Sequence, residues 1–332
     1  MTSAPVNGRF VRNCSVERTL AILDDAWSFL VLREFYMGAR RFEQIRTVLQ
    51  APRSTLSERL SRLLEAGLIR QVPQNGTDGR LEYRLTESGM DLYLVMLTLM
   101  RFGDDHLCDD RGAPLTLVHA GCGHPCKPET LCSECGEPVG AQQVAYRDGP
   151  GAGRSPLRVQ RQRRRSKGES PFERNRPSSV SRTLEILADR WSFLILREFF
   201  FGVRRYEQLR EKLGIASNIL ADRLAHLVER GILRKVPYSR QPLRYEYRLS
   251  AMGRDLFLPL IQMLRWGDRW LGHESPLILT HMGCGQDFRP VVACSHCKHR
   301  LDPREVSYRL NYSLGSGASK PPAQLDRSPP RQ

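Results

Sequence analysis

The sequence lacks long apolar runs and has few acidic residues relative to basic ones. Nowhere do about 18 apolar residues follow one another, so no transmembrane helix is expected. The N-terminal segment also lacks the apolar stretch of a secretory signal, which predicts a cytoplasmic protein. Against 36 Asp and Glu stand 51 Lys and Arg, a net charge of +15. This excess favours a polyanionic partner, with nucleic acid ahead of a membrane surface.

Cysteine is present in an odd number, nine, and six of the nine lie in two spaced clusters. Such usage suits metal ligation in a reducing compartment better than a disulfide framework. With 332 residues the chain is long enough for two domains, each with its own core.

An internal duplication organises the sequence. Shifted by 164 residues, Cys14–Gly103 superimposes without a gap on Ser178–Gly267, and 43 of the 90 positions are identical. After a change of offset to 162, the match resumes through the two cysteine clusters. We call the two halves copy one and copy two. The period is too long for a solenoid repeat, so a whole domain is duplicated.

The repeat predicts a domain plan. Each copy has a helical domain, at 10–108 and 178–272, and a Cys/His knuckle, at 114–148 and 276–310. Between them, 149–177 is rich in Gly, Pro, Ser and Arg and has nine basic residues against two acidic ones, so a basic disordered linker is expected. The tail at 313–332 is expected to be disordered as well.

Local patterns in one copy predict helices followed by a hairpin. Apolar residues at helical spacing mark helices over 15–23 and 27–37, then two short helices with a break at Ala51 and Pro52. Two short helices joined by a tight turn are typical of a helix-turn-helix motif. Thr55 and Glu58 resemble a capping box, and Asn218 is the cap candidate in copy two.

Turn residues between two strand-like stretches then predict a β-hairpin wing, and an apolar helix over 89–107 follows. The fold class expected is mainly α with small β-wings, an α+β class containing tandem winged helix-turn-helix domains.

A family resemblance is carried by the strings VERTLAILDDAWSFLVLREFYMGARRFEQI, LSERLSRLLEAGLI and EYRLTESG, and by their equivalents between Val180 and Gly253. Together they resemble the HxlR-type winged-helix regulators. The resemblance implies a DNA-binding transcription regulator that dimerises through terminal helices. An enzyme is not expected, because neither copy shows an open metal position, a paired acid and base, or a phosphate-cradling glycine loop. Two copies in one chain then suggest a monomer with an internal pseudo-dimer; a homodimer of the fused chain is the alternative.

Candidate DNA contacts lie on the second helix of each motif, whose N-terminal side chains would meet base edges while flanking basic residues hold phosphates. The core leucines agree between copies, but the reading positions do not, which predicts two different half-sites. The alternative is that one copy has drifted and makes only phosphate contacts. The copy-one candidates are Arg53, Ser54, Thr55, Ser57 and Glu58, with Arg59, Arg62 and the wing residue Arg80 on phosphates. The copy-two candidates are Ser217, Asn218, Ile219, Ala221 and Asp222, with Arg223, His226 and Arg244.

Candidate metal ligands occur twice in the spacing H-x2-C-x9-C-x2-C. Three thiolates and one imidazole satisfy tetrahedral zinc, so each copy is predicted to hold one structural zinc ion, two in all. Cys126 is a substitute ligand in copy one. The first set is His119, Cys122, Cys132 and Cys135, and the second is His281, Cys284, Cys294 and Cys297.

Cys14 is a candidate redox sensor, since some proteins of the family it resembles carry such a cysteine before the first helix and a helix N-terminus lowers a thiol pKa. Ser178 occupies the matching place in copy two, so a small capping residue explains both. The alternatives to a DNA-binding regulator are a protein-interaction module and a redox-sensing regulator. An unidentified small-molecule or redox effector is an expected partner.

Overall fold

The computed structural model describes residues 10–23, 25–74, 81–110, 112–156, 176–187 and 189–312. The chain forms two compact units, and neither is a continuous stretch of sequence. Unit 1 comprises Met1–Ala21, Val139–Ser170 and Ile186–Arg289; unit 2 comprises Ile22–Pro138, Pro171–Glu185 and Pro290–Gln332. The predicted boundaries therefore describe the two sequence copies, whereas each compact unit takes segments from both.

Unit 2 contains the helix-turn-helix motif of copy one. Its motif helices are packed through one apolar face, on which Leu56, Leu60 and Leu63 are buried. Asp25 caps α2, the helix before the motif, by accepting a hydrogen bond from the Ser28 backbone N–H. The elements are α2 (Ala26–Tyr36), α3 (Phe42–Leu49), α4 (Arg53–Glu65), β2 (Ile69–Pro73), β3 (Leu81–Leu85), α5 (Glu87–Asp91) and α6 (Tyr93–His106).

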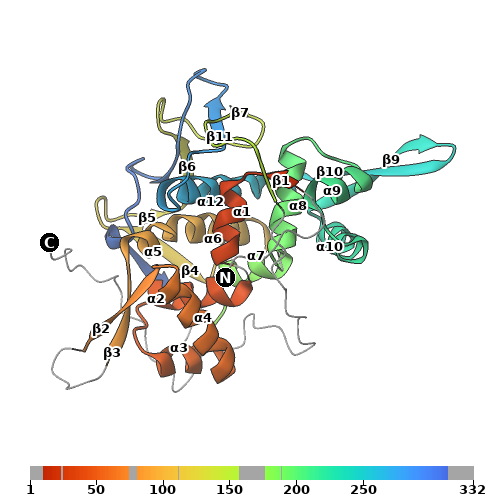
Figure 1. Ribbon diagram of the computed structural model, residues 1–332. Coiled ribbons are helices and arrows are strands. Elements are labelled where there is room, and N and C mark those ends of the chain that lie inside the picture. The colour runs from red at the N-terminus through yellow and green to blue at the C-terminus, as the bar shows by residue number, and fades with distance from the viewer. Residues whose placement is uncertain are drawn as a thin grey trace. The chain divides into compact units, whose positions relative to one another are not determined.

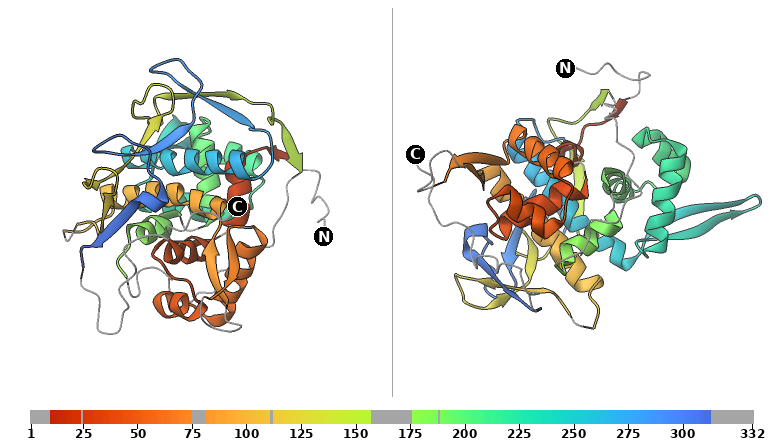
Figure 2. Two further views of the ribbon diagram at one scale, coloured as in Figure 1. Left: turned by 90° about the vertical axis from the view of Figure 1, so that its left-hand side faces the viewer. Right: turned by 90° about the horizontal axis from the view of Figure 1, so that it is seen from below.

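Unit 1 contains the same motif and a hairpin from copy two. The two hairpin strands extend well beyond the helices of their unit (Figures 1 and 2). The elements are α8 (Arg190–Phe200), α9 (Tyr206–Leu213), α10 (Ser217–Glu229), β9 (Leu233–Arg240), β10 (Leu243–Leu249), α11 (Ala251–Asp255) and α12 (Phe257–Trp270).

The second motif helices begin earlier than the sequence predicted. Pro52 and Ala216 are their N-caps, so Thr55 and Asn218 lie inside the first turn and do not cap. Pro52 has φ −55° and ψ 139°, a conformation that proline favours just before a helix and that leaves no side-chain acceptor. The expected capping box is therefore wrong.

The N-terminal helix of each copy packs on the long helix of the other copy. In unit 1, α1 (Ser15–Ile22) lies on α12, and Thr19 Oγ1 donates to the Met263 carbonyl at 2.9 Å. In unit 2, α7 (Ser179–Leu187) lies on α6, and Thr183 Oγ1 donates to the Leu99 carbonyl at 2.8 Å.

Glycine permits this close approach at matching positions. A Cβ built on Gly267 would lie 2.6 Å from the Ser15 carbonyl oxygen, and one on Gly103 would lie 2.2 Å from the Ser179 carbonyl oxygen. Any larger residue at either position would push the two helices apart.

Strand pairing also joins the copies inside each unit. In unit 1, β7 (Val144–Asp148) pairs antiparallel with β11 (Leu277–His281). In unit 2, β6 (Pro128–Cys132) pairs with β12 (Pro290–Cys294), while β4 (Leu115–His119) lies between β13 (Val306–Leu310) and β5 (Pro125–Cys126). Just before β13 lies a short 3-10 helix, η1 (Pro303–Glu305). The predicted knuckles at 114–148 and 276–310 are thus interleaved segments and not separate domains.

Part of the predicted linker is ordered. In unit 1, β8 (Arg154–Pro156) pairs with β1 (Phe10–Arg12), and the Gly151 N–H donates to the Ser275 carbonyl at 3.0 Å. The expectation of disorder is wrong for 149–156, because these backbone groups pair with other strands and loops of their unit. Residues 157–175 and the predicted tail at 313–332 lie outside the described residues. Among the described helices, none is both long and apolar enough to cross a membrane.

Candidate nucleic-acid interface and metal centre

The first turn of α4 presents polar side chains to solvent in unit 2. Arg53, Ser54 and Ser57 are exposed, and Thr55, Glu58 and Arg62 are partly exposed. The Arg53 guanidinium lies over the Phe42 ring, 5.3 Å from its centroid, and its side chain is 78% exposed. This turn can therefore offer a cation and hydroxyl groups to a groove of DNA.

The first turn of α10 offers different chemistry in unit 1. Ser217, Asn218 and Ala221 are exposed, as is Asp222, while Ile219 and His226 are partly exposed. The Ser217 hydroxyl accepts a hydrogen bond from Arg210 at 3.3 Å. The face is accessible as the sequence predicted, but it lacks an arginine in the place of Arg53.

Two arginines that were predicted to bind phosphates form ion pairs with aspartates of the protein itself. Arg59 binds the carboxylate of Asp25, the cap of α2, at 2.5 Å, and Arg223 binds Asp189, the cap of α8, at 2.6 Å. Burial lowers the pKa of Arg223, but its hydrogen bond to Asp189 and the charges of Asp189 and Asp222 raise it further, so the net shift is upward. Each arginine therefore links its recognition helix to the helix that comes before the motif, α2 in unit 2 and α8 in unit 1.

The wing of unit 1 adds an arginine-rich surface. Arg244 is exposed on β10, as predicted. At the base of the hairpin a hollow of about 320 Å³ is lined by Arg204, Arg234, Arg248 and Arg254, among others. Arg234 and Arg248 are cross-strand neighbours, so recognising them as a pair requires the hairpin register. The copy-one wing residue Arg80 lies outside the described residues.

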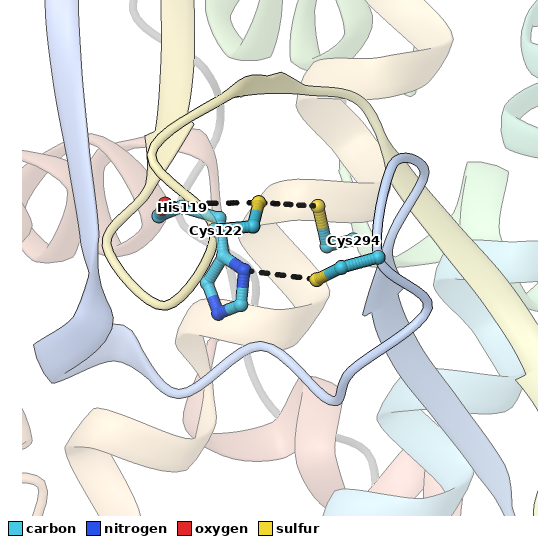
Figure 3. A group of neighbouring side chains, drawn as sticks. His119, Cys122 and Cys294 are labelled. Atoms are coloured by element: carbon cyan, nitrogen blue, oxygen red, sulfur yellow. Dashed lines mark hydrogen bonds between the residues drawn. The ribbon is translucent and has the colours of Figure 1, made fainter.

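A four-residue Cys/His cluster lies in unit 2, with two ligands from each copy. His119 ends β4 and Cys122 follows it, while Cys294 ends β12 and Cys297 follows it. One ligand atom from each of the four lies within 4.8 Å of all the others. His119 Nδ1 is 3.3 Å from Cys297 Sγ, and Cys122 Sγ is 3.9 Å from Cys294 Sγ. Figure 3 shows His119, Cys122 and Cys294 directed toward one another.

The surroundings of this cluster fit a bound metal ion. Three sulfurs and one imidazole nitrogen are a donor set that zinc accepts. The His119 ring is buried, and a Cβ on Gly121 would lie 3.0 Å from it, so glycine makes room for the ring. Burial raises the pKa of Cys294, but backbone N–H groups of Cys297 and His296 lower it more, so the net shift favours the thiolate.

The ligand grouping predicted from the sequence is wrong for this cluster. His119 and Cys122 meet the Cys-x2-Cys turn of copy two and not that of copy one, because β12 pairs with β6 and brings the copy-two turn into unit 2. Cys132 and Cys135 also belong to unit 2, whereas His281 and Cys284 belong to unit 1.

Cys126 lies close to the cluster but is not one of its four ligands. Burial, and then the neighbouring thiols of Cys294, Cys122 and Cys297, raise the pKa of Cys126 to about 12. Because Cys126 is not among the grouped ligand atoms, its role as a substitute ligand stays a prediction.

Cys14 is buried at the start of α1 in unit 1, next to Arg197. Cys14 is only 3% exposed, so the thiol offers little surface to a reagent in solution.

Comparison with known proteins matches both copies. The model of the HxlR-like helix-turn-helix family matches residues 22–111 and 186–275, more than half of the 332 residues. The chain belongs to the HxlR-like helix-turn-helix family. Its members include HTH-type transcriptional regulators, so this HxlR-like chain is a DNA-binding regulator of that kind, and its two matched segments confirm the tandem repeat.

Relatives of this HxlR-like chain are about as long as one copy of its repeat. Rv3095 of Mycobacterium tuberculosis, named as an uncharacterized HTH-type transcriptional regulator, is 46% identical over 131 residues, which are 39% of this chain and 83% of the relative. The regulator sll1512 of Synechocystis is 38% identical over 105 residues, 31% of this chain and 78% of the relative. The crystal structure of PA1607, named as a candidate transcription factor, shares 37% identity over 37% of this chain and 87% of its own, with a TM-score of 0.34.

Proposed function

We propose that this HxlR-like regulator is a cytoplasmic protein that binds duplex DNA through both recognition helices of one chain, as an intramolecular pseudo-dimer on two unlike half-sites. The observation that carries the proposal is the contrast between the two recognition helices. Their buried leucines and their Arg–Asp ties are equivalent, but their exposed first turns differ. The buried contacts of the two helices are the same and only the exposed residues differ. The difference therefore lies in the first turn of each helix, where side chains would contact DNA bases.

The exchanged N-terminal helices support the pseudo-dimer. In relatives with one copy, two chains would be needed to supply the α1 and α12 partners that this chain supplies alone. Recognition helices of helix-turn-helix dimers meet half-sites about 10 bp apart. The same spacing is expected here between two dissimilar motifs.

Selection from random duplex DNA, followed by sequencing, tests this proposal. We expect two unlike half-motifs at one fixed spacing. Arg53→Ala should then alter base preference in one half-motif, and Asn218→Ala in the other, while Arg46→Ala, on the exposed face of α3, serves as the matched control. A palindromic site, or one half-motif changed by both variants, would contradict the proposal.

Zinc is the ion we propose for the cluster of His119, Cys122, Cys294 and Cys297. Bound there, it would act as a structural ion with four protein ligands, leaving no open position for catalysis. Because its ligands come from both copies, it would fasten the segment after β4 to the segment after β12.

Metal counting on single and double variants tests the ligand grouping. Cys122→Ser and Cys297→Ser should each remove the same ion, so the double variant should lose no more zinc than either single one. Loss of a second ion in the double variant would instead support the grouping predicted from the sequence, in which all four ligands of each ion come from one copy. Cys108→Ser, outside the cluster, is the control and should keep the full zinc content.

A redox role for Cys14 is a second candidate, favoured by its place beside the Arg197 guanidinium. Cys14→Ser should abolish any change in DNA affinity that hydrogen peroxide causes; an unchanged response would exclude Cys14 as the sensor.

A further inference from the structure

The hollow at the base of the unit 1 hairpin is lined by four arginines and has a volume of about 320 Å³. Arg234 and Arg248 come from the two hairpin strands. Arg204 comes from the loop after α8, and Arg254 comes from α11. The volume lies within the range of small-molecule pockets, roughly 300–1,000 Å³. The remaining lining residues, none of them acidic among those described, are Gln142, Phe199 and Leu249.

Most of the positive charge around the hollow has no partner in the protein. Arg248 binds Glu246 at 2.6 Å. The other three arginines form no ion pair with any described carboxylate. Arg234 and Arg248 also lie directly opposite each other on the two strands, where like charges repel. An anion in the hollow would offset this repulsion and accept hydrogen bonds from several guanidinium groups.

Backbone contacts hold the walls of the hollow in place. The Tyr247 N–H donates to the Arg204 carbonyl at 2.8 Å, which fixes the loop after α8 beside β10. Helix α11 packs closely on the start of the hairpin, since a Cβ on Gly253 would lie 2.2 Å from the Ile232 carbonyl oxygen. The arginines therefore extend from fixed backbone positions around one space, which lowers the entropic cost of binding an anion.

The matching residues of unit 2 differ. Arg40, which matches Arg204, donates through Nη1 to two carbonyls near the end of α2, at 3.1 and 3.0 Å. Met90 stands in the place of Arg254, so unit 2 lacks the charge that α11 supplies in unit 1. Both copies have the helix-turn-helix motif, but this arrangement of arginines is particular to unit 1. Binding of DNA by the motif therefore does not account for it.

We propose that this hollow binds a small phosphate monoester. The phosphate group would lie among Arg234, Arg248 and Arg254, and the organic group would lie against Phe199 and Leu249. Guanidinium groups bind phosphate oxygens through paired hydrogen bonds. A monoester carries nearly two negative charges at neutral pH, which match several cations better than the single charge of a carboxylate does. The bound molecule would link both hairpin strands to α11.

Calorimetric titration of the full chain, without DNA, tests binding. Phenyl phosphate at pH 8 should bind with a 1:1 stoichiometry. Phenyl sulfate has a similar shape and one negative charge, and should bind about tenfold more weakly, equivalent to about 1.4 kcal/mol. Absence of phenyl phosphate binding, or equal binding of phenyl sulfate, would overturn the proposal. Several equivalent sites per chain would indicate diffuse attraction to a basic protein and would overturn it as well.

Matched variants locate the site. Arg234→Gln should weaken phenyl phosphate binding about tenfold, because it removes a charged hydrogen-bond donor. Arg70→Gln, at the matching position of unit 2, should leave binding unchanged, as should Arg244→Gln, on the same hairpin but outside the lining of the hollow. Arg254→Met introduces the unit 2 residue and should also weaken binding, which keeps the test valid if Arg234→Gln does not fold. Full binding by both hollow variants in folded protein would overturn the proposal.

A titration of the DNA complex distinguishes a free ester from the phosphates of DNA. Phenyl phosphate should still bind at one site when the chain is saturated with duplex DNA, and Arg234→Gln should weaken that binding too. Loss of the site in the complex would show that DNA phosphates fill the hollow, which would overturn the proposal. A chain that binds no DNA would refute the proposed function but not the ester site, which is measured without DNA.

Discussion

The two helix-turn-helix motifs of this chain have the same framework and different details. Both bury leucines at the same positions of the recognition helix and both tie that helix to a capping aspartate. They differ in the first turn of that helix and in the partners of one buried glutamate. Contacts that hold the helices together were kept after duplication, while residues facing outward and the partners of the buried glutamate diverged.

The buried glutamates give the largest expected difference. Glu34 is shared by Arg33 and Arg176 in unit 2, whereas Glu198 in unit 1 is bound closely by Arg197. Glu34→Ala should cost about 3–5 kcal/mol, because it leaves two buried arginines without their carboxylate. Urea unfolding, with hydrogen exchange to assign the loss to α2, measures it. If Glu198→Ala costs more than Glu34→Ala, the comparison fails; Glu43→Ala, on the exposed face of α3, should cost almost nothing.

A buried carboxyl on α6 makes unit 2 sensitive to pH. Burial raises the pKa of Asp104 to about 6, although its hydrogen bond from Ser179 acts in the opposite direction. Since this folded-state pKa lies above the unfolded one, the folded chain holds the proton more tightly. The stability that the proton provides is complete below about pH 4 and is lost as pH rises through about 6.

The loss should amount to about 3 kcal/mol in the free energy of unfolding. Urea midpoints at a series of pH values, compared with those of Asp104→Asn, isolate this contribution. A difference between the two proteins that does not vary with pH would exclude Asp104 as its source. The matching Asp268 in unit 1 also has a raised pKa, owing to burial, so Asp268→Asn should change the profile in the same direction.

The two Arg–Asp ties should behave alike. Arg59→Met and Arg223→Met should each cost about 1–2 kcal/mol, less than a fully buried pair because each carboxylate is partly exposed. Thermal unfolding compares the two variants. Arg53→Met is the control: it should leave stability within about 0.5 kcal/mol while weakening DNA binding. Unequal costs at Arg59 and Arg223 would show that the frameworks have diverged too.

The turn of the motif gives the smallest expected effect. The residue that ends the first motif helix is left-handed in both copies, Gln50 with φ 47° and Gly214 with φ 61°. Because glycine adopts this conformation without a Cβ clash, Gln50→Gly should stabilise unit 2 by about 1 kcal/mol, and Gly214→Gln should destabilise unit 1 by a similar amount. Chemical unfolding should show opposite signs; equal signs would refute the explanation.

The helices and turns were largely predictable from the sequence, but which segments pack together was not. Apolar spacing predicted a helix over 27–37, which the structure has at Ala26–Tyr36, and the helix ending at Leu49 is where the sequence placed it. The His-x2-Cys and Cys-x2-Cys turns were also recognisable. Which turns meet depends on strand pairs between residues more than 150 positions apart, such as Leu131 with Val291, and spacing within one copy carries no information about those pairs.

The exchanged N-terminal helices have a consequence for how the chain is made. Thr19 in α1 is hydrogen-bonded to a carbonyl 244 residues later in the sequence. A ribosome adds about 5–20 residues per second, so the growing chain would wait roughly 12–50 s between exposing the first helix and synthesising the surface that covers it. During synthesis, the apolar face of α1 is therefore exposed for this time. Such a surface is prone to aggregation, so chaperones that bind nascent chains are expected to cover α1 until α12 is made.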